Sequence, residues 1–424
     1  MSRSLTRTVL MGAVAASAAL ALAGCGSGFG SSNDTGNGGS GSTSKLTSSN
    51  DPLTVLIGSS GDAETNAVKS AVASWSSSSG TKATVIPANN LDQQLAQGFA
   101  AKKPADVFYL STGSLPGYAA NGSLLAYGDQ LPSDLKNDFY PSLVKNFTYD
   151  GKFYCAPKDV STLQLIINTD KWKAAGLTDA DYPKTWDDLA TVAKKLTSGG
   201  TTGLVVSGQY ERLGAFMVQA GGNLTNADNT KVTADSAANV KALSYAQSLL
   251  KAGSMKFAAD VGAGWGGEAF GKGLGAMTIE GNWISGSMQS DYPNVHYKVV
   301  PLPEGPKGKG TLQFTNCWGI AADSPNQKAA LKLVEQLTSK EDQLQFSKAF
   351  GVMPSIQSAA SDWKQEFPEY TPFLDATDYA EGVPTLKNVA PVITDLDGKI
   401  AQLKTTDPKT ILDSAQSNLQ ALLK

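Results

Sequence analysis

Residues 53–87 read LTVLIGSSGDAETNAVKSAVASWSSSSGTKATVIP, and this segment indicates the class of fold. Both of its ends, 53–58 and 81–87, are apolar and rich in β-branched side chains, as buried strands are. Between them the apolar side chains recur at helical spacing: Ala67, Ala71, Val72 and Trp75. We therefore predict a strand–helix–strand unit and, from it, an α/β protein with a parallel sheet.

The segment that follows extends this sheet. Apolar residues four apart predict a helix over 91–99, and a third strand is expected at 106–110. In open sheets of this kind, ligands bind beyond the carboxyl ends of the strands. The loops after Gly58 and Leu110 are polar, and they are the first candidates for a binding site.

The rest of the chain predicts a second set of elements. A capping box, Thr185-x-x-Asp188, opens a helix over 186–196, and Asp407 with Pro408 opens a C-terminal helix. Further strands are expected at 163–168, 203–207, 274–279, 296–302 and 317–322, and further helices at 328–337 and 339–350. Because the 424 residues exceed the ~250–300 at which single cores stop growing, we expect two lobes.

The amino terminus has the features of an export signal. Two arginines precede an apolar stretch over 9–22 that is too short to span a bilayer, and LAGC follows at 22–25. This pattern resembles the lipobox of bacterial lipoproteins, so we predict a signal peptide over 1–24 and lipidation of Cys25. An ordinary signal peptide with an incidental cysteine is the alternative. Residues 25–50 are mainly Gly, Ser, Asn and Thr, and this composition predicts a flexible tether. The lipid on Cys25 would anchor the protein to the extracytoplasmic face of the cell membrane, and the tether would connect the anchor to the folded body.

Composition excludes several classes of function. The net charge is −3 and Lys and Arg are scattered, so the sequence offers no basic stripe for nucleic acid. A single histidine, His296, and the lack of a Cys-x-x-Cys pair argue against a metal site, and we predict no cofactor. Cys155 and Cys317 in an oxidising compartment could form one disulfide or remain two buried thiols. Catalytic motifs such as Gly-x-Ser-x-Gly and His-Glu-x-x-His are absent from the sequence.

Several spaced motifs point to one family. They occur in order as 149–157 (YDGKFYCAP), 165–170 (LIINTD), 183–188 (PKTWDD), 270–273 (FGKG), 276–283 (AMTIEGNW), 301–303 (PLP) and 324–326 (SPN). Together they resemble the extracellular solute-binding proteins of family 1, the maltose-binding-protein-like components of ABC importers, over residues 52–424. The resemblance implies a two-lobed periplasmic-binding-protein fold of type II, the Venus-flytrap form, with three hinge crossings near 155–157, 315–318 and 382–385. It assigns 51–154 and 319–381 to lobe 1, and 157–314 and 385–424 to lobe 2.

The same resemblance implies the function. A protein of this kind captures a small solute, here a mono- or oligosaccharide, between two closing lobes, delivers it to the membrane permease and catalyses nothing. It is expected to be a monomer whose partners are the solute, the permease subunits and, through Cys25, the membrane. Because the resemblance puts Cys155 and Cys317 on hinge segments, it also implies that they lie close together, where a disulfide can form. Maltose itself is not expected, because the tryptophan of maltose-type sites near the third hinge is absent and Ile393 lies nearby.

A sugar site needs polar groups for hydroxyls and aromatic rings for the flat C–H faces of the sugar. Trp283 is the strongest candidate ring, because it follows a strand and matches a tryptophan that faces the cleft in the family. Trp265 is flanked by glycines, so its ring either stacks on the solute or folds onto its own lobe. The weaker candidates and the remaining wall of the first lobe are Trp318, Tyr210, Tyr109 and Ser111.

The expected acceptors of hydroxyl hydrogen bonds are four carboxylates: Asp62, Glu64, Asp159 and Glu280. Asp62 and Glu64 also stand at the start of a helix, where carboxylates collect as caps, so capping is an alternative role for both. Two other functions stay open. A cationic solute such as a polyamine could use the acidic loops and the tryptophans, and a carbohydrate-active enzyme could use two of the carboxylates.

Overall fold

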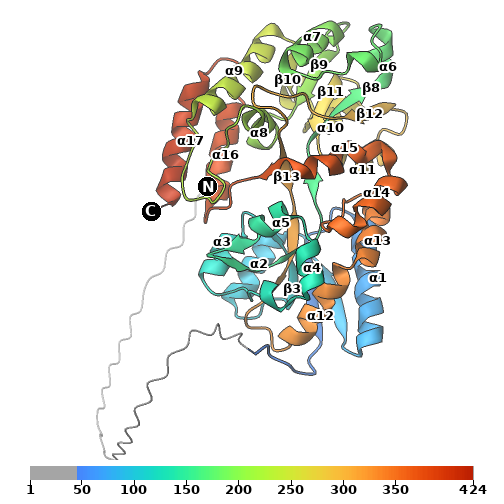
Figure 1. Ribbon diagram of the computed structural model, residues 1–424, viewed down its shortest axis with the longest axis vertical. Helices are drawn as coiled ribbons and strands as arrows, with labels where there is room; N and C mark the ends of the chain where they lie inside the picture. The colour runs from blue at the N-terminus through green and yellow to red at the C-terminus, as the bar shows by residue number, and fades with distance from the viewer. Residues whose placement is uncertain (1–44, 424) are drawn as a thin grey trace, which may run out of the picture. The chain divides into compact units, whose positions relative to one another are not determined.

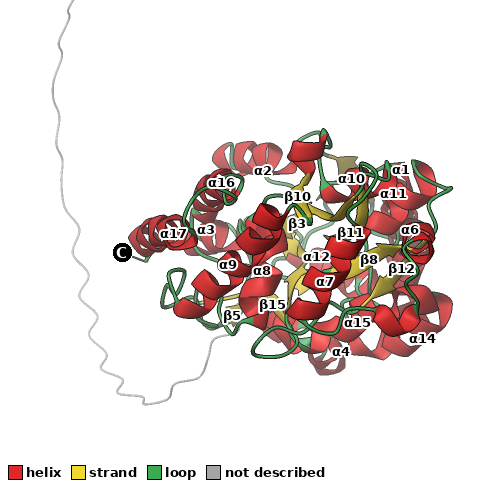
Figure 2. Ribbon diagram, turned by 90° about the horizontal axis from the view of Figure 1, so that it is seen from above, coloured by secondary structure: helices red, strands yellow, loops and turns green. Residues whose placement is uncertain are grey.

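Two five-stranded sheets form the framework of the protein (Figure 1). The computed structural model describes residues 45–423, so the predicted signal peptide, Cys25 and most of the predicted tether lie outside the described residues. Among the described helices, none is both long and apolar enough to cross a membrane. Figure 2 shows helices on both sides of the strands, the arrangement expected of an α/β protein.

The first sheet is built on the segment 53–87. β1 (Leu53–Ile57), α1 (Asp62–Ser79) and β2 (Ala83–Pro87) form the predicted strand–helix–strand unit, and β1 pairs in parallel with β2. After α2 (Leu91–Ala100), β3 (Val107–Ser111) pairs in parallel with the other side of β1. β14 (Asn316–Ile320) and β6 (Ala156–Pro157) complete the sheet as antiparallel strands. The predicted unit and its parallel pairing are confirmed.

The second sheet has the strand order β10-β9-β11-β8-β12. Its strands are β8 (Gln164–Asn168), β9 (Thr202–Val206), β10 (Met255–Phe257), β11 (Gly275–Glu280) and β12 (Tyr297–Val300). β10, β9 and β11 are parallel, whereas β8 is antiparallel to both β11 and β12. Every residue of β8, β9 and β11 is buried, which explains why these strands are so rich in apolar residues.

A small third sheet lies where the chain passes between the two larger ones. β13 (Thr311–Phe314) pairs in parallel with β15 (Ala380–Gly382) and antiparallel with β7 (Ser161–Thr162). β7 stands between β6 of the first sheet and β8 of the second, and β13 directly precedes β14. The two-lobed α/β fold is therefore confirmed. We call the part that carries the first sheet the first lobe, and the part that carries the second sheet the second lobe.

The remaining elements cover these sheets. In the first lobe they are α3 (Leu115–Ala120), α4 (Ser133–Asp138), α5 (Pro141–Asn146), the hairpin β4 (Thr148–Tyr149) and β5 (Lys152–Phe153), α12 (Gln327–Leu337) and α13 (Lys340–Phe350). In the second lobe they are α6 (Thr169–Ala174), α7 (Trp186–Leu196), α8 (Tyr210–Gln219), α9 (Ala237–Ala252), α10 (Gly266–Gly271), α11 (Ile284–Ser290), α16 (Val389–Ile400) and α17 (Pro408–Leu422). α14 (Ala360–Glu366) and α15 (Thr371–Asp375) lie at the boundary.

Two helices begin where their sequence signals predict. At α7, Thr185 Oγ1 accepts from Asp188 N, and the Asp188 carboxylate accepts from Thr185 N, so the predicted capping box is present. At α17, the Asp407 carboxylate accepts a hydrogen bond from Thr410 N at 3.1 Å. Caps of this kind are local, and this is why the sequence alone locates them.

A third hydrophobic cluster joins the two lobes. Its members come from both, and they include Leu143, Phe270, Ile284, Trp363 and Phe373. The segment 319–381 was expected in lobe 1, yet α14 and α15 also contact the second lobe through this cluster. Thr162 Oγ1 and Gln164 Nε2 donate to main-chain oxygens of α15 at 2.6 and 2.8 Å. The apolar faces of α14 and α15 therefore bind to both lobes.

The folded body begins before residue 50, where the tether was expected to end. Leu46 packs against the core of the first lobe. Thr47 N donates to Gln327 Oε1 at 3.1 Å, and Thr47 Oγ1 donates to Ser324 O at 2.7 Å. Leu46 and the hydrogen bonds of Thr47 thus attach this segment near the start of α12. The Gly- and Ser-rich composition of the segment does not indicate this attachment.

Cys155 and Cys317 form a disulfide, and their Cα atoms lie 5.6 Å apart. Both side chains are buried. Cys317 lies on β14, and Cys155 directly precedes β6, which pairs with β14. The bridge therefore ties two of the segments that connect the lobes.

Candidate ligand-binding cleft

A cavity of about 250 Å³ lies between the two lobes, at the carboxyl end of β1. The first lobe lines it with the loop after β1 and with the end of α13, and the second lobe lines it with the residues after β11. The lining residues are Gly58, Ser60, Glu64, Lys158, Asp159, Val160, Ser161, Asn282, Trp283, Phe314, Thr315, Asn316, Phe350, Gly351 and Val352. The loop after Gly58, chosen because parallel strands end there, is thus part of this cleft.

A charged cluster forms one side of the cleft, and we call it the cleft floor: Glu64, Lys158, Asp159, Tyr109 and Phe350. Lys158 is only 8% exposed, and its ammonium forms ion pairs with Glu64 at 3.2 Å and with Asp159. The same nitrogen lies 4.6 Å from the centroid of the Tyr109 ring and 5.6 Å from that of Phe350. Two carboxylates and two aromatic rings therefore surround one buried cation.

Both oxygens of each floor carboxylate accept hydrogen bonds from protein donors. Glu64 Oε1 accepts from Tyr109 Oη at 3.0 Å, and Glu64 Oε2 accepts from both N and Oγ of Ser60 at 2.7 Å. The second oxygen of Asp159 accepts from Asn316 N at 3.4 Å. Burial raises the pKa of Glu64, but Lys158 and the Ser60 bonds outweigh burial, so this pKa lies below its ordinary value. Burial lowers the pKa of Lys158, and the neighbouring carboxylates raise it by more.

A second cluster, the cleft wall, belongs largely to the second lobe: Arg212, Glu280, Trp283 and Phe314. Trp283 is 38% exposed, and its Nε1 donates to Glu280 Oε2 at 3.1 Å. Arg212 binds the same oxygen through Nη2 at 2.8 Å and Nε at 3.0 Å, and its guanidinium carbon lies 5.2 Å from the Trp283 ring centroid. Phe314 meets that ring edge to face at 5.6 Å. The indole is thus held by its neighbours and still presents surface to the cleft.

Two features of the wall follow from its packing. Gly281 lets the indole lie against the backbone, because an added Cβ would stand 2.2 Å from the Trp283 ring. Glu280 is fully buried, and its Oε1 has no hydrogen-bond partner among the described residues. Burial raises the pKa of Glu280 above its ordinary value, although Arg212 acts in the opposite direction.

Five residues predicted from the sequence lie in or beside this cleft: Glu64, Tyr109, Asp159, Glu280 and Trp283. Asp62 is exposed on the first turn of α1 and does not line the cavity. Ser111 is half-buried and bonds Ser114. The alternative role at the helix start applies to Glu64, whose Oε2 accepts a hydrogen bond from Ser60 N just before α1 while the residue also lines the cleft.

Three predicted aromatic residues give the cleft no ring surface in this structure. Tyr210 is fully buried, and its hydroxyl donates to Asn223 Oδ1 at 2.9 Å. Trp318 is also buried, and it packs edge to face on Tyr109. The Trp265 ring lies on Gly267, where an added Cβ would stand 2.1 Å away. Of the two roles considered for Trp265, folding onto its own lobe is the one observed.

Lys158 and Asn282 are among the polar residues of the cleft that sequence reasoning missed. Lys158 stands out in the sequence as a charge between apolar residues, at CAPKDV, but lysines are usually solvated. Asn282 Nδ2 donates to Gly351 O of the first lobe at 2.7 Å, while its Oδ1 is buried without a partner among the described residues. Asn282, from the motif EGNW, thus lines the cleft and bonds the second lobe to the first.

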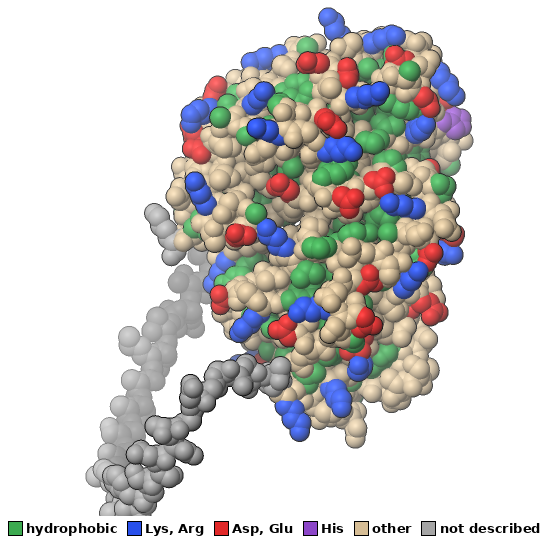
Figure 3. Space-filling model, in the orientation of Figure 1, with side chains coloured by type: hydrophobic (Ala, Val, Ile, Leu, Met, Phe, Trp, Pro, Cys, Tyr) green, Lys and Arg blue, Asp and Glu red, His purple; other side chains and the backbone are tan. Residues whose placement is uncertain are grey.

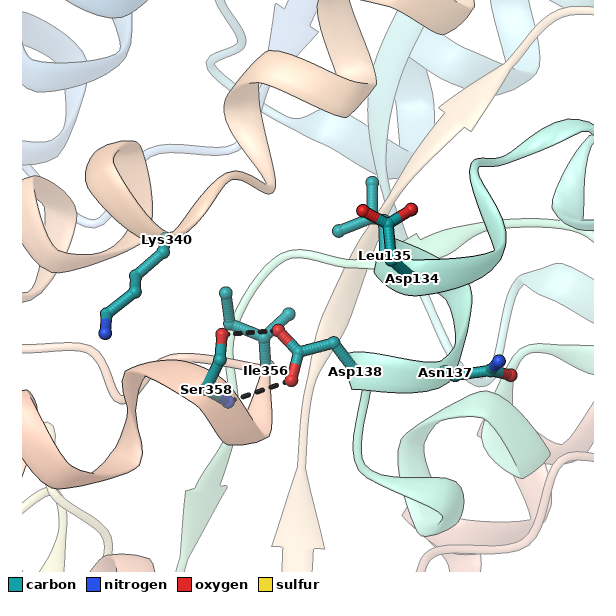
Figure 4. A pocket seen from close by; sticks show the side chains of 7 residues that line it. All are labelled: Asp134, Leu135, Asn137, Asp138, Lys340, Ile356 and Ser358. Carbon is teal, nitrogen blue, oxygen red and sulfur yellow. Dashed lines mark hydrogen bonds between the residues drawn. The ribbon is translucent and has the colours of Figure 1, made fainter.

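Other hollows are separate from this cleft. One of about 430 Å³ lies on the first lobe between α4 and the segment around Ser358 (Figure 4). There Ser358 donates to Asp138 through both N, at 2.8 Å, and Oγ, at 2.5 Å, so these polar groups are already paired. Another, of about 390 Å³, lies between the start of α3 and residues 387–391. Neither contains a residue of the cleft floor or wall.

Comparison with known proteins identifies the family. A family model described as bacterial extracellular solute-binding protein matches residues 72–372. The chain belongs to this family. This solute-binding protein is 28% identical over 289 residues to the diacetylchitobiose binding protein DasA of Streptomyces coelicolor, a match that covers 65% of this chain and 66% of that one. It is 26% identical over 384 residues to the sn-glycerol-3-phosphate-binding periplasmic protein UgpB of Pectobacterium atrosepticum, covering 81% of this chain and 85% of that one.

Solved structures show the same fold. The cyclic alpha-maltosyl-1,6-maltose binding protein of Arthrobacter globiformis superposes with a TM-score of 0.78 at 22% identity, over 88% of this chain and 99% of that one. The GacH receptor of Streptomyces glaucescens superposes with a TM-score of 0.75 at 21% identity, over 88% and 98%. The resemblance inferred from the spaced motifs is therefore confirmed at the level of family and fold.

Proposed function

We propose that this solute-binding protein is the extracytoplasmic receptor of an ABC importer and captures a neutral mono- or oligosaccharide in the cleft between its lobes. The observation that carries the proposal is the pairing of a partly exposed indole, Trp283, with a floor whose carboxylates are already paired with a protein ammonium. A sugar presents flat C–H faces and hydroxyls, so it suits an aromatic surface beside uncharged polar groups. The relatives named for diacetylchitobiose and for cyclic maltosyl-maltose support this class of solute.

The wall supplies the proposed stacking surface. One part of the Trp283 ring contacts Arg212 and Phe314, and the exposed part is available to the solute. Asn316, a half-buried residue that lines the same cavity, offers a side-chain amide to a hydroxyl. Because the cleft is lined by both lobes, a solute that touches both favours their closed arrangement by its differential affinity. The permease subunits would then recognise that closed arrangement.

The proposed location follows from the chain start. Lipidation of Cys25 and a tether over the following residues would hold the receptor at the membrane that carries the permease, as a monomer. On the face drawn in Figure 3, Lys and Arg are mixed with Asp and Glu, so this face carries no basic stripe.

The geometry favours binding over catalysis. A glycosidase needs one carboxyl group that can act as an acid beside a second that acts as a base or nucleophile. The floor carboxylates Glu64 and Asp159 are both paired with Lys158, and Glu280 lies buried under Arg212. These contacts support the proposal that the cleft holds its solute unchanged.

A thermal-shift screen across a sugar library tests the proposal, because a bound solute raises the melting temperature by mass action. Trp283→Ala is expected to weaken binding of the sugar found by about ten- to hundredfold, since an aromatic contact of this kind is worth roughly 1–3 kcal/mol. Trp265→Ala removes an indole of the same lobe that lies outside the cavity, and it is expected to bind normally. The recovered sugar should be chromatographically unchanged.

The outcomes separate the parts of the proposal. If the wild-type protein is stabilised by no sugar but is stabilised by an amine, the class of solute is wrong. If Trp283→Ala binds as the wild type does, the stacking surface is wrong and the class stands. Cleavage of the sugar during incubation would favour the enzyme alternative.

A further inference from the structure

We propose that Lys158 makes the cleft select neutral solutes over cationic ones, because its own ammonium fills a cation cage at the cleft floor. The inference rests on the proposed function, since it concerns the solute that the same cleft accepts. It is carried by four contacts of one nitrogen: Glu64 Oε1, the Asp159 carboxylate, the Tyr109 ring and the Phe350 ring. Carboxylates and aromatic faces around a single point are what proteins use to bind alkylammonium ions.

The cation in this cage is a side chain of the protein itself, the ammonium of Lys158. Lys158 lies on the segment that connects the lobes, and its backbone N donates to Asn316 O of β14 at 2.8 Å. The next residue is held as well, because Thr315 Oγ1 donates to Asp159 O at 2.7 Å. Glu64 and Tyr109 approach from the first lobe, on α1 and β3. The backbone that carries the ammonium is therefore held in place by hydrogen bonds to neighbouring residues.

The carboxylates of this cage are already bonded to protein donors. Both oxygens of Glu64 accept hydrogen bonds from the protein, and so do both oxygens of Asp159. A solute ammonium that approached these carboxylates would also stand beside Lys158, whose like charge offsets part of their attraction and whose side chain occupies the space between them. The acidic residues that made a polyamine plausible from the sequence are thus already engaged.

The same arrangement admits a neutral solute. An ammonium group has three N–H donors and no acceptor, and Lys158 uses two of its donors on Glu64 and Asp159. The third can donate to an oxygen of a hydroxyl or carbonyl group. An alkylammonium solute has no such oxygen at its charged end. Lys158 therefore discriminates by charge and by hydrogen-bond type together.

The test removes the internal cation and supplies a matching one from outside. Lys158→Ala deletes three carbons and the ammonium, which are the atoms of n-propylammonium. We expect n-propylammonium chloride to raise the melting temperature of Lys158→Ala and to bind it at least tenfold more tightly than it binds the wild type. Potassium chloride at equal ionic strength and 1-propanol, which has the same shape without the charge, are expected to stabilise neither protein.

Two controls separate the cage from general effects of charge. Lys158→Arg keeps a cation on the segment and should gain no affinity for n-propylammonium. Lys158→Ala combined with Glu64→Gln and Asp159→Asn keeps the space but removes the negative charges, so it should lose the gain. If Lys158→Ala does not fold alone, refolding it with n-propylammonium is expected to restore the folded protein, and failure there counts against the cage.

The wild-type protein supplies an independent arm. Putrescine at hundredfold excess should leave sugar binding unchanged, and competition between them would overturn the inference. If n-propylammonium stabilises Lys158→Ala but the wild-type protein binds no sugar, the proposed function is wrong and the cage stands. Sugar binding by the wild type without rescue of Lys158→Ala would count against the cage alone.

Discussion

The cleft floor and the cleft wall are made from the same kinds of residue but use them differently. Each sets a cation and an acidic group against an aromatic ring: Lys158 with Glu64 and Tyr109 in the floor, and Arg212 with Glu280 and Trp283 in the wall. In the floor the ring is buried, whereas in the wall the ring is 38% exposed. The ring of the floor therefore contacts a protein cation, and the ring of the wall leaves exposed the part that we propose for the solute.

The polar groups of the two clusters differ in the same way. Both oxygens of Glu64 have donors, while three donors converge on one oxygen of Glu280 and its other oxygen has none among the described residues. The net effect on the two acids is opposite: the pKa of Glu64 lies below its ordinary value, and that of Glu280 lies above. Similar composition thus gives an internally paired cluster in one place and a partly exposed ring in the other.

The largest expected effect comes from breaking the floor. Glu64→Ala leaves Lys158 paired with Asp159 but leaves the Tyr109 hydroxyl and Ser60 without their acceptor, which should lower the free energy of unfolding by about 1–3 kcal/mol. Asp62→Ala removes an exposed carboxylate two residues earlier on the same helix and should change it by less than about 0.5 kcal/mol. Urea denaturation measures both. Equal effects of the two substitutions would show that the floor is not a buried ion cluster.

The opposite pKa shifts predict opposite pH dependences. Because Glu64 has a folded pKa below 4.5, the stability it contributes is complete above pH 4.5 and is lost as the pH falls through the folded value. Because Glu280 has a folded pKa above 4.5, the native state binds its proton more tightly, so stability falls as the pH rises from 4.5 through that value.

Glu64→Gln and Glu280→Gln reveal these dependences, because neither glutamine titrates. As the pH is lowered, the difference in the free energy of unfolding between the wild type and Glu64→Gln should shrink. Over the same change in pH, the free energy of unfolding of the wild type should rise relative to that of Glu280→Gln. Each unit of pKa shift corresponds to about 1.4 kcal/mol in the free energy of unfolding. Urea titrations from about pH 2.5 to about pH 8 measure both differences, and slopes of the same sign would contradict the contrast between floor and wall.

The sequence predicted what local patterns encode. The unit β1–α1–β2, the caps of α7 and α17 and the loop after Gly58 all depend on neighbouring residues, and the structure has them where expected. Lys158 was missed because its partner Glu64 lies 94 positions away. The attachment of α14 and α15 to both lobes was missed for the same reason, since apolar spacing shows that a face is buried without showing against which partner.

The candidate rings show the same limit more sharply. Trp283, Trp265, Trp318 and Tyr210 all follow or lie on strands near the lobe boundary, so sequence position favoured all four. Exposure separates them, and it depends on contacts across the fold: Trp318 faces Tyr109 on the neighbouring strand, and Tyr210 reaches Asn223. A glycine near a tryptophan in the sequence indicates that the ring has room to pack there, but it does not show whether the ring faces the cleft. Gly267 makes room for Trp265 to fold down on its own helix, while Gly281 makes room for Trp283 beside the cleft.

The smallest expected effect tests whether the position of the wall indole matters for binding. In Gly281→Ala the new methyl group would stand 2.2 Å from the Trp283 ring, so the ring has to move. Moving it disturbs its contacts with Arg212, Glu280 and Phe314, which set its orientation in the cleft. We expect sugar affinity to fall about five- to tenfold, or roughly 1 kcal/mol, with a shift in indole fluorescence.

Gly286→Ala is the matched control, because it adds the same methyl group five residues later, where no atom lies within 4 Å. On helix α11 this change should stabilise the protein by about 0.5–1 kcal/mol, since alanine has less backbone freedom to lose than glycine, and it should leave affinity unchanged. Affinity measured by calorimetry separates the two variants. If Gly281→Ala shifts the fluorescence and binds sugar as the wild type does, the ring moves without consequence, and the exposed surface of Trp283 is not what distinguishes the wall from the floor.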